Sequence, residues 1–229
     1  MDQQPLGFQR WCDLLFVHWT VPVAALRRLV PEWLAIDLFE GRAYVTMIPF
    51  RIVESRPAGF PQALSTHFLE ANLRTYVRAP DGQAGIYFFS LEASSVLAVV
   101  GARLLYALPY YLAAMSAVTT GARTTYTSRR LIGRPAWLDA TYVVSEPAGS
   151  SADAIDHFLV ERYLLYVHRG RALYRTRVRH APYPLKRVTL ERLDQTLVEA
   201  AGLPNPGPVS ACHFSPGVDV HIYWHERVP

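Results

Sequence analysis

The chain has 229 residues, of which 51% are hydrophobic and 18% are charged; this is enough to bury a sizeable core, and we expect one domain over residues 1–229. The net charge of +4 is carried by arginines spread along the chain, without zinc-finger spacing or an RNA-recognition motif, so we expect no nucleic-acid partner. Two cysteines, Cys12 and Cys212, exclude a disulfide framework and a thiolate metal cluster.

The apolar segments lack the features of targeting and membrane-spanning sequences. The first residues, MDQQPLGFQRWCDLLF, have an acid at position 2 and no basic region of the kind that begins a secretory signal. The longest apolar run, residues 87–115, is interrupted by Glu92, Arg103 and Pro109, so we expect no spanning helix and no membrane partner. These features predict a cytoplasmic protein.

The first elements in chain order are a short helix and a hairpin. In TVPVAALRRLVP, residues 20–31, the apolar side chains have the spacing of an amphipathic helix, and Pro31 ends it. Residues 33–52 contain two β-rich runs around Glu40 and Gly41, which predicts a hairpin.

The next segment, HFLEANLRTYVR at residues 67–78, alternates strictly and predicts a strand with one polar face. That face carries Phe68, Glu70, Asn72, Arg74 and Tyr76. The turn APDGQAG, residues 79–85, leads into a partner strand at residues 86–93.

A helix follows this pair of strands. Ser94 or Ser95 can cap it, its apolar residues recur at helical spacing, and we expect it to end before Pro109. Three further strands are predicted at residues 112–120, 123–130 and 137–144.

The last third of the chain mixes short helices and strands. Residues 150–163 predict a short capped helix or turn, and residues 164–181 predict a hairpin with Gly170 at its tip. Residues 188–202, VTLERLDQTLVEAAG, have the clearest amphipathic helical spacing, and residues 209–224 supply the last strands. Strands outnumber helices, which predicts an α+β domain around a large curved antiparallel sheet or barrel.

Several of these segments carry a family resemblance. ALRRLVPEWLAID, HFLEANLRTYV and VVGARLLYALPYYLAAM resemble three segments of acetoacetate decarboxylases. DLLFVHWTVP, FFSLEA, HFLVERY, LYRTRV and HFSPGVDV extend a closer resemblance, over nearly the full length, to the YqjF-like family of uncharacterised bacterial proteins in the same superfamily. The resemblance implies a cone-like β-barrel with a few peripheral helices, a mostly apolar central pocket and a homo-oligomer.

The resemblance also implies that the Schiff-base chemistry of the decarboxylases is missing. Their lysine pair falls on Tyr110 and Tyr111, and a phenol cannot form an imine. The one lysine of the chain, Lys186, lies in APYPLKRV, between two prolines and a predicted surface helix. We expect this segment to be exposed, so Lys186 is not expected to replace the pair.

Other pocket positions of the decarboxylases are partly retained. The resemblance places their active-site glutamate on Glu70 and a second pocket glutamate on Tyr44. Their pocket arginine falls on Cys12, with Arg10 two residues away as the nearby substitute.

The histidines and serines do not form a recognised metal or nucleophile motif. No H-E-x-x-H sequence occurs, and Ser215 lacks the G-x-S-x-G elbow of hydrolases. His213 with Asp219 is the best local pair, and the alternative is a histidine that holds the Ser-Pro-Gly turn by a hydrogen bond. We therefore expect neither a metal nor a cofactor.

The polar strand face is the strongest candidate for a ligand site. If Glu70, Asn72 and Arg74 face a closed pocket, burial requires that they pair or bind a polar ligand group, and an arginine can clamp a carboxylate. Alternatively, this face is solvated or contacts a neighbouring subunit. His67 and His18 can join either arrangement.

Two classes of function remain. In one, the chain is an enzyme for a small keto or carboxylic compound, with Glu70 as acid/base and Tyr110 or Tyr111 as a hydrogen-bond donor to a developing oxyanion. In the other, it is a small-molecule binding module without chemistry. The fold alone does not decide between them.

Overall fold

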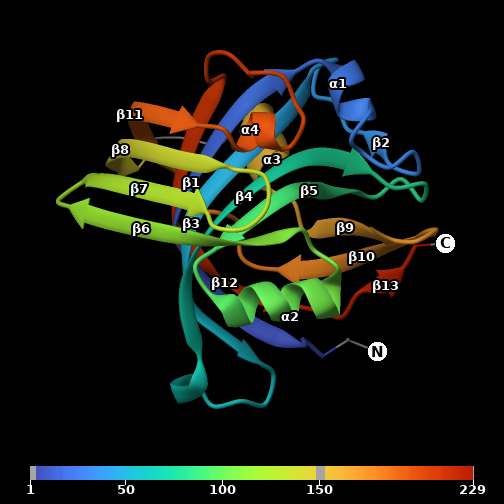
Figure 1. Cartoon of the computed structure of the whole chain (residues 1–229), viewed down its shortest axis with the longest axis horizontal. Helices are drawn as coiled ribbons and strands as arrows, with labels where there is room; N and C mark the ends of the chain where they lie inside the picture. The colour runs from blue at the N-terminus through green and yellow to red at the C-terminus, as the bar shows by residue number, and fades with distance from the viewer. Residues whose placement is uncertain (1–3, 148–152, 229) are drawn as a thin grey trace.

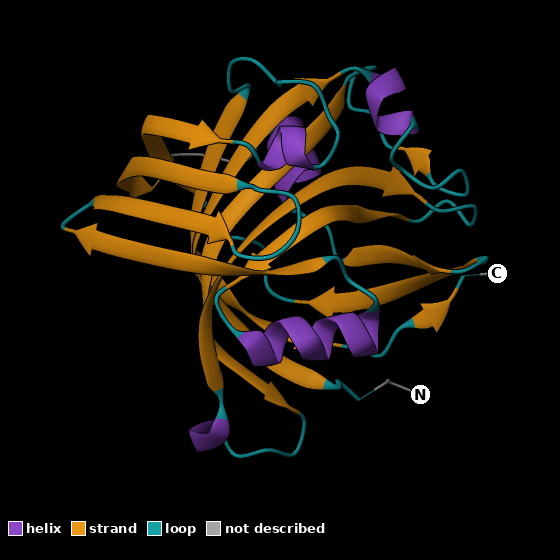
Figure 2. Ribbon diagram, in the orientation of Figure 1, coloured by secondary structure: helices purple, strands orange, loops and turns teal. Residues whose placement is uncertain are grey.

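The computed structural model describes residues 4–147 and 153–228, which form one thirteen-stranded sheet with short helices (Figures 1 and 2). The strands are β1 (Gly7–Val21), β2 (Ala35–Ile36), β3 (Ala43–Pro57), β4 (Thr66–Arg78), β5 (Ala84–Ala93), β6 (Tyr110–Thr120), β7 (Arg123–Arg130), β8 (Trp137–Pro147), β9 (Leu164–Arg169), β10 (Ala172–Arg179), β11 (Lys186–Gln195), β12 (Ala211–Ile222) and β13 (Glu226–Arg227). The helices are α1 (Val23–Arg27), α2 (Val96–Tyr106), α3 (Ala154–Val160) and α4 (Leu197–Ala200), with a 3₁₀ turn η1 (Gln62–Leu64). Within these described ranges, no helix is long and apolar enough to span a membrane.

Five strands in the order β12-β1-β3-β4-β5 form the centre of the sheet, which then divides into two branches. One branch holds β9, β10 and β13, and the other holds β6, β7, β8 and β11. Both branches connect β5 to β12, because β5 pairs with β9 and with β6 while β12 pairs with β10 and with β11. The sheet is therefore strongly curved and encloses one compartment on each face of the central strands.

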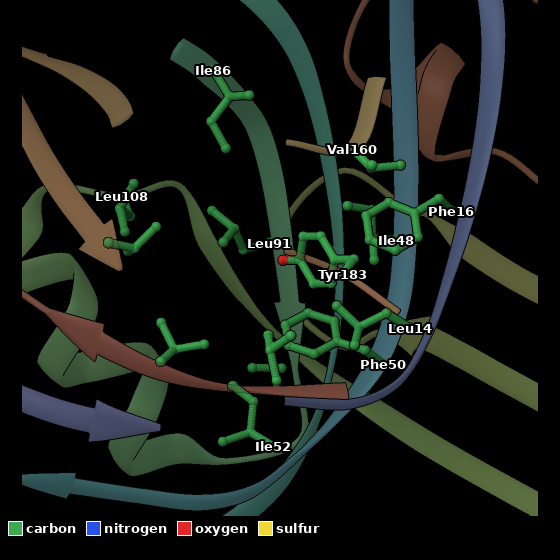
Figure 3. Packing of buried hydrophobic residues seen from close by; sticks show 14 of the residues in the cluster. Leu14, Phe16, Ile48, Phe50, Ile52, Ile86, Leu91, Leu108, Val160 and Tyr183 are labelled. Atoms are coloured by element: carbon green, nitrogen blue, oxygen red, sulfur yellow. The ribbon is translucent and has the colours of Figure 1, made fainter. Parts of the chain in front are cut away.

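The two compartments have separate apolar cores, because side chains alternate between the faces of each central strand. On β1, for example, Leu14 and Phe16 enter the first core, whereas Leu15 and Val17 enter the second. The first core lies under the β9–β10 branch with α2 and α3 (Figure 3). The second packs α1, α4 and the β7–β8 strands against the other face.

Most of the predicted elements are present. α2 begins at the Ser95 cap, whose Oγ accepts a hydrogen bond from the backbone N–H of Ala98, and it ends well before Pro109. The hairpin with Gly170 at its tip is the β9–β10 pair. The predicted helix over residues 150–163 corresponds to α3, and residues 150–152 lie outside the described residues. The pairings of β5 with β6 and with β9 are parallel, which the antiparallel expectation did not include.

The predicted helix over residues 188–202 is wrong. Most of this segment is strand β11, and only Leu197–Ala200 is helical. The register with β8 shifts by one residue between Leu190 and Arg192, so Leu190 and Leu193 both contact the second core. This irregularity gives a strand the three-residue apolar spacing that is typical of a helix.

The predicted hairpin at Glu40 and Gly41 is correct only for its turn. Both residues have positive φ angles, of 49° and 75°, and the flanking Phe39 and Arg42 exchange two backbone hydrogen bonds. The strand before the turn, β2, then pairs with β4 instead of β3.

Candidate active site

A cavity of about 150 Å³ lies in the first compartment, on the inner face of the central strands. For comparison, an apolar cavity of roughly 150 Å³ holds a benzene molecule. Figure 3 shows the side chains of Ile48, Phe50 and Tyr183 close together, with Leu91 facing them from β5. The polar side chains among its lining residues are Gln9, Glu70, Asn72, Arg74, Tyr106, Tyr110, Arg162, Thr176 and Tyr183.

Glu70 and Tyr110, which the resemblance places at active-site positions of the decarboxylases, meet in this cavity. Glu70 comes from the polar face of β4, and Tyr110 is the first residue of β6, paired in parallel with Leu91 of β5. The Tyr110 hydroxyl donates to Glu70 Oε2 at 2.7 Å. Glu70 is 3% exposed, and burial raises its pKa from 4.5 to about 7, although the hydrogen bond from Tyr110 opposes this shift. The same burial and the neighbouring carboxyl raise the pKa of Tyr110 well above 10.0.

Asn72 and Arg74 extend the polar face of β4 along the cavity. Arg74 is 5% exposed, and its Nη2 donates to the backbone carbonyl of Leu159 at 3.3 Å. The buried Arg74 Nε and Asn72 Oδ1 have no hydrogen-bond partner, and neither does Thr176 Oγ1 on β10. None of the ion pairs between described residues includes Arg74. The cavity therefore presents a buried cation and unused hydrogen-bonding groups to any occupant.

The polar face of β4 is thus buried, so the solvated alternative is wrong. A buried polar group without a partner costs free energy. Three such groups beside one cavity leave hydrogen-bonding capacity for a polar occupant, whether water or a ligand.

Tyr111 is not in the cavity, because neighbouring residues on β6 point to opposite faces. Its ring packs against two guanidinium groups, with Arg130 Cζ at 3.7 Å and Arg103 Cζ at 5.5 Å from the ring centroid. Arg130 in turn forms a buried ion pair with Glu92 of β5. Tyr111 therefore packs against charged side chains outside the cavity, and its predicted place in the site is wrong.

Three predicted ligand-binding residues also lie outside the lining of the cavity. Tyr44 is buried in the first core, where its ring lies 6.3 Å from that of Phe158 on α3. His67 is exposed near the start of β4. Arg10 is exposed and pairs with Asp219, with 2.6 Å between Arg10 Nε and Asp219 Oδ1.

The predicted pair of His213 and Asp219 does not form. They are separated on β12, and His213 instead contacts Asp156 of α3, with 2.8 Å between His213 Nε2 and Asp156 Oδ1. The other ring nitrogen of His213 lies 3.0 Å from Nε2 of the fully buried His18.

Some lining residues carried no signal in the sequence. Arg162 follows α3, and its Nη2 lies 3.2 Å from Asp37 Oδ2. Thr176 is one residue in an alternating strand, and Tyr183 lies in a loop between β10 and β11. Their approach to the cavity depends on pairing between distant strands, which local periodicity does not report.

Comparisons with solved structures identify the fold. The enduracididine biosynthesis enzyme MppR complexed with pyruvate has a TM-score of 0.70 at 14% identity, covering 98% of this chain and 91% of that one. Acetoacetate decarboxylase from Legionella pneumophila has a TM-score of 0.70 at 14% identity, covering 99% and 88% of the two chains. The chain thus has an α+β, acetoacetate decarboxylase-like fold.

Sequence comparisons identify the family. The uncharacterized protein YqjF of Bacillus subtilis is 38% identical over 221 residues, which cover 96% of this chain and 90% of YqjF. The DUF2071 family model, described as an uncharacterized conserved protein, matches residues 8–219. Because both matches extend over nearly the whole chain, this protein belongs to the YqjF-like DUF2071 family.

Proposed function

We propose that the cavity binds a small carboxylate-bearing keto compound and that Glu70 acts on it as an acid/base without an imine. The observation that carries this proposal is Arg74, a buried guanidinium with an unused Nε and no acidic partner among the described residues. A ligand carboxylate would supply both the missing charge and the missing acceptor. The complex of the structurally similar MppR with pyruvate suggests the class of ligand.

Glu70 and Tyr110 support acid/base chemistry on such a ligand. A general base works best when its pKa lies near the working pH, and burial brings the pKa of Glu70 to about 7. The carboxylate can take a proton from the carbon next to a ketone, and the C–H electron pair then moves onto the ketone oxygen as an enolate. Once Glu70 has taken up the proton, the single hydroxyl hydrogen of Tyr110 can turn from Glu70 to the enolate oxygen and stabilise it.

Binding of pyruvate, with acetone as the uncharged counterpart, tests the role of Arg74. We expect pyruvate to bind by calorimetry and acetone to bind much more weakly. Arg74→Met should weaken pyruvate binding by roughly ten- to a hundredfold, which is the usual effect of removing a hydrogen bond to a charged group. Arg177→Met is the matched control, because Arg177 is exposed and lies beside the lining residues Thr176 and Val178 on β10. Equal pyruvate affinity in the Arg74 variant and the control would refute the proposed clamp.

Hydrogen exchange at the methyl group of pyruvate tests the chemistry. In D₂O, the enzyme should replace methyl hydrogen with deuterium, and proton NMR should show the methyl signal decreasing. Glu70→Gln should abolish this exchange while pyruvate still binds, because the amide keeps the shape of the carboxyl but cannot accept the proton.

The second candidate is a binding module without catalysis. It is favoured because the lysine positions of the decarboxylases hold Tyr110 and Tyr111 in this chain, and neither phenol can form an imine. The ring of Tyr111 packs against Arg130. Pyruvate binding without methyl exchange in the wild-type protein would select this alternative.

A further inference from the structure

A chain of hydrogen-bonding side chains crosses the inner face of the central strands next to the cavity. From β12 to β4, it joins His213 to His18 at 3.0 Å, His18 Nδ1 to Thr46 Oγ1 at 2.7 Å, and Thr46 to the Tyr76 hydroxyl at 2.5 Å. Its inner end is the backbone carbonyl of Leu159 on α3, which lies 2.6 Å from the Tyr76 hydroxyl. His18, Thr46 and Tyr76 are each fully buried, so the described contacts must satisfy their polar groups.

The direction of every bond in this chain follows from its inner end. A carbonyl only accepts, so Tyr76 donates its single hydroxyl hydrogen to Leu159 and must accept from Thr46. Thr46 then has no further hydrogen and must accept from His18 Nδ1–H. His18 is fully buried, and burial lowers its pKa well below 6.5, so it is neutral and its Nε2 carries a lone pair.

At the outer end of this series of hydrogen bonds, His213 requires one additional proton. Because His18 Nε2 is an acceptor, His213 Nδ1 must carry hydrogen and donate to it. The other nitrogen, His213 Nε2, faces Asp156 Oδ1 at 2.8 Å, and a carboxylate only accepts. The second oxygen of Asp156 accepts from the backbone N–H of Asp153. Both ring nitrogens of His213 are thus donors.

We propose that His213 is held as an imidazolium by Asp156, and that this proton fixes α3 and thereby positions Arg74 for the ligand carboxylate. The connection is the Leu159 carbonyl, which accepts from both Tyr76 and Arg74 Nη2. His213 is a positioning residue, since the side chains of His18, Thr46 and Tyr76 and the Leu159 carbonyl separate it from Arg74. The part of the proposal that concerns Arg74 rests on the proposed function, whereas the part that concerns the proton does not.

Two carboxylates and two guanidinium groups lie around this series of hydrogen bonds. On α3, Asp156 is the anion that faces His213, while His18 on β1 is neutral and Arg74 on β4 is a buried cation near His18. Arg162 lies over the Tyr76 ring, with Cζ 5.4 Å from its centroid, and is paired with Asp37. Without this second proton, the lone pair of His213 Nε2 would face the Asp156 carboxylate, and the hydrogen bond between β12 and α3 would be missing.

The proton itself is tested without a ligand. Nitrogen-15 NMR of the histidine rings at pH 7 should show both nitrogens of His213 protonated, and His18 as the neutral tautomer with hydrogen on Nδ1. In Asp156→Asn, the amide N–H₂ can donate to a neutral His213, so the second proton should be lost. A neutral His213 in the wild-type protein at pH 7 would refute the proposal.

The connection to Arg74 is tested with pyruvate as the probe. Tyr76→Phe should weaken pyruvate binding by roughly tenfold, the effect of one buried hydrogen bond. Tyr166→Phe is the matched control, because Tyr166 is equally buried and also donates to a backbone carbonyl, that of Gln83 at 3.0 Å.

The results separate the two proposals. If no pyruvate binds while His213 is doubly protonated, the proposed function fails and the proton assignment stands. If pyruvate binds equally to wild type, Tyr76→Phe and Tyr166→Phe, the proposed role of the hydrogen-bonded series in positioning Arg74 is refuted.

Discussion

Glu70 places a carboxyl group in an apolar cavity, and its protonation connects stability with chemistry. Because its pKa is raised from 4.5 to about 7, the folded protein binds this proton more tightly than the unfolded chain does. The contribution of Glu70 to stability is therefore fully present at acid pH. It is lost as the pH rises from about 4.5 through 7, when the folded state must hold a buried charge.

The Glu70→Gln variant should remove this loss. The free energy of unfolding of the variant minus that of wild type should increase by roughly 3 kcal/mol from pH 4.5 to pH 8. One pKa unit corresponds to about 1.4 kcal/mol. Urea unfolding at both pH values measures the difference. Glu191→Gln, at an exposed position on β11, is the control and should show little change. A parallel pH dependence in wild type and Glu70→Gln would contradict the raised pKa.

The pair Tyr110 and Tyr111 shows what a sequence can and cannot predict at single residues. The resemblance to decarboxylases correctly brought Tyr110 to Glu70. It also suggested Tyr111, but alternation along β6 turns that ring to Arg130. The assignment of Arg10 failed because its partner, Asp219, is more than two hundred residues away and no local pattern reports such a pair.

Glu92 and Arg130 connect the elements at the point where the sheet divides. Glu92 is on β5 and Arg130 on β7, with Arg130 Nη2 at 2.5 Å and Arg130 Nε at 3.0 Å from the two carboxylate oxygens. The side chain of Arg130 is only 4% exposed and that of Glu92 only 1%. The pair therefore holds β5, β6 and β7 together around Tyr111.

Arg130→Met should destabilise the fold by about 3–5 kcal/mol, because it leaves the buried Glu92 without a partner. The double variant with Glu92→Leu should recover much of this loss. Arg123→Met is the matched control, since its ion pair with Glu191 is exposed and should contribute less than about 1 kcal/mol. Urea unfolding measures all three, and equal losses in the two single variants would contradict this role.

Gly217 allows β12 to lie against a distorted part of β1. Its φ is 139°, and an added Cβ would lie 2.2 Å from the Trp11 carbonyl oxygen. Opposite it, Cys12 precedes Asp13, which has a φ of 54°, and the β1–β3 register shifts just beyond. Both strands are therefore irregular at the same level.

Gly217→Ala should cost roughly 2 kcal/mol or more, because it combines backbone strain with a clash against fixed backbone. Gly170→Ala is the control: its φ is also positive, at 58°, but an added Cβ meets no atom within 4 Å. That variant should lose only about 1 kcal/mol. Thermal unfolding measures both, and a smaller loss at Gly217 would contradict the argument.

Elements with regular alternation or a clear cap were predictable, and irregular strands were not. The alternation of β4 and the Ser95 cap of α2 are local properties that the structure retains. In β11, the shift after Leu190 changes the apolar spacing, so a strand had the pattern of a helix. The pairing of β2 with β4 is set by distant contacts.

At the scale of the whole molecule, the division of the sheet separates the cavity from the one lysine of the chain. Lys186 begins β11, and its backbone partner on β12 is Phe214, a residue of the second core. Residues paired in an antiparallel ladder point to the same face, so Lys186 points to the second compartment. Glu70 and Tyr110 lie in the first compartment, on the opposite side of the central strands.

The protein should therefore form no imine at Lys186 with keto acids. An imine requires an unprotonated primary amine next to the substrate carbonyl, and the cavity offers a carboxyl, two amides, hydroxyls and guanidinium groups instead. Treatment with borohydride and either pyruvate or acetoacetate should leave the mass of the Lys186 peptide unchanged, whereas an acetoacetate decarboxylase treated alike should gain a reduced adduct. An adduct on Lys186 would mean that the chain between Tyr183 and β11 can rearrange to bring the amine across β12. Methyl exchange without such an adduct would instead favour proton transfer by Glu70 in the first compartment.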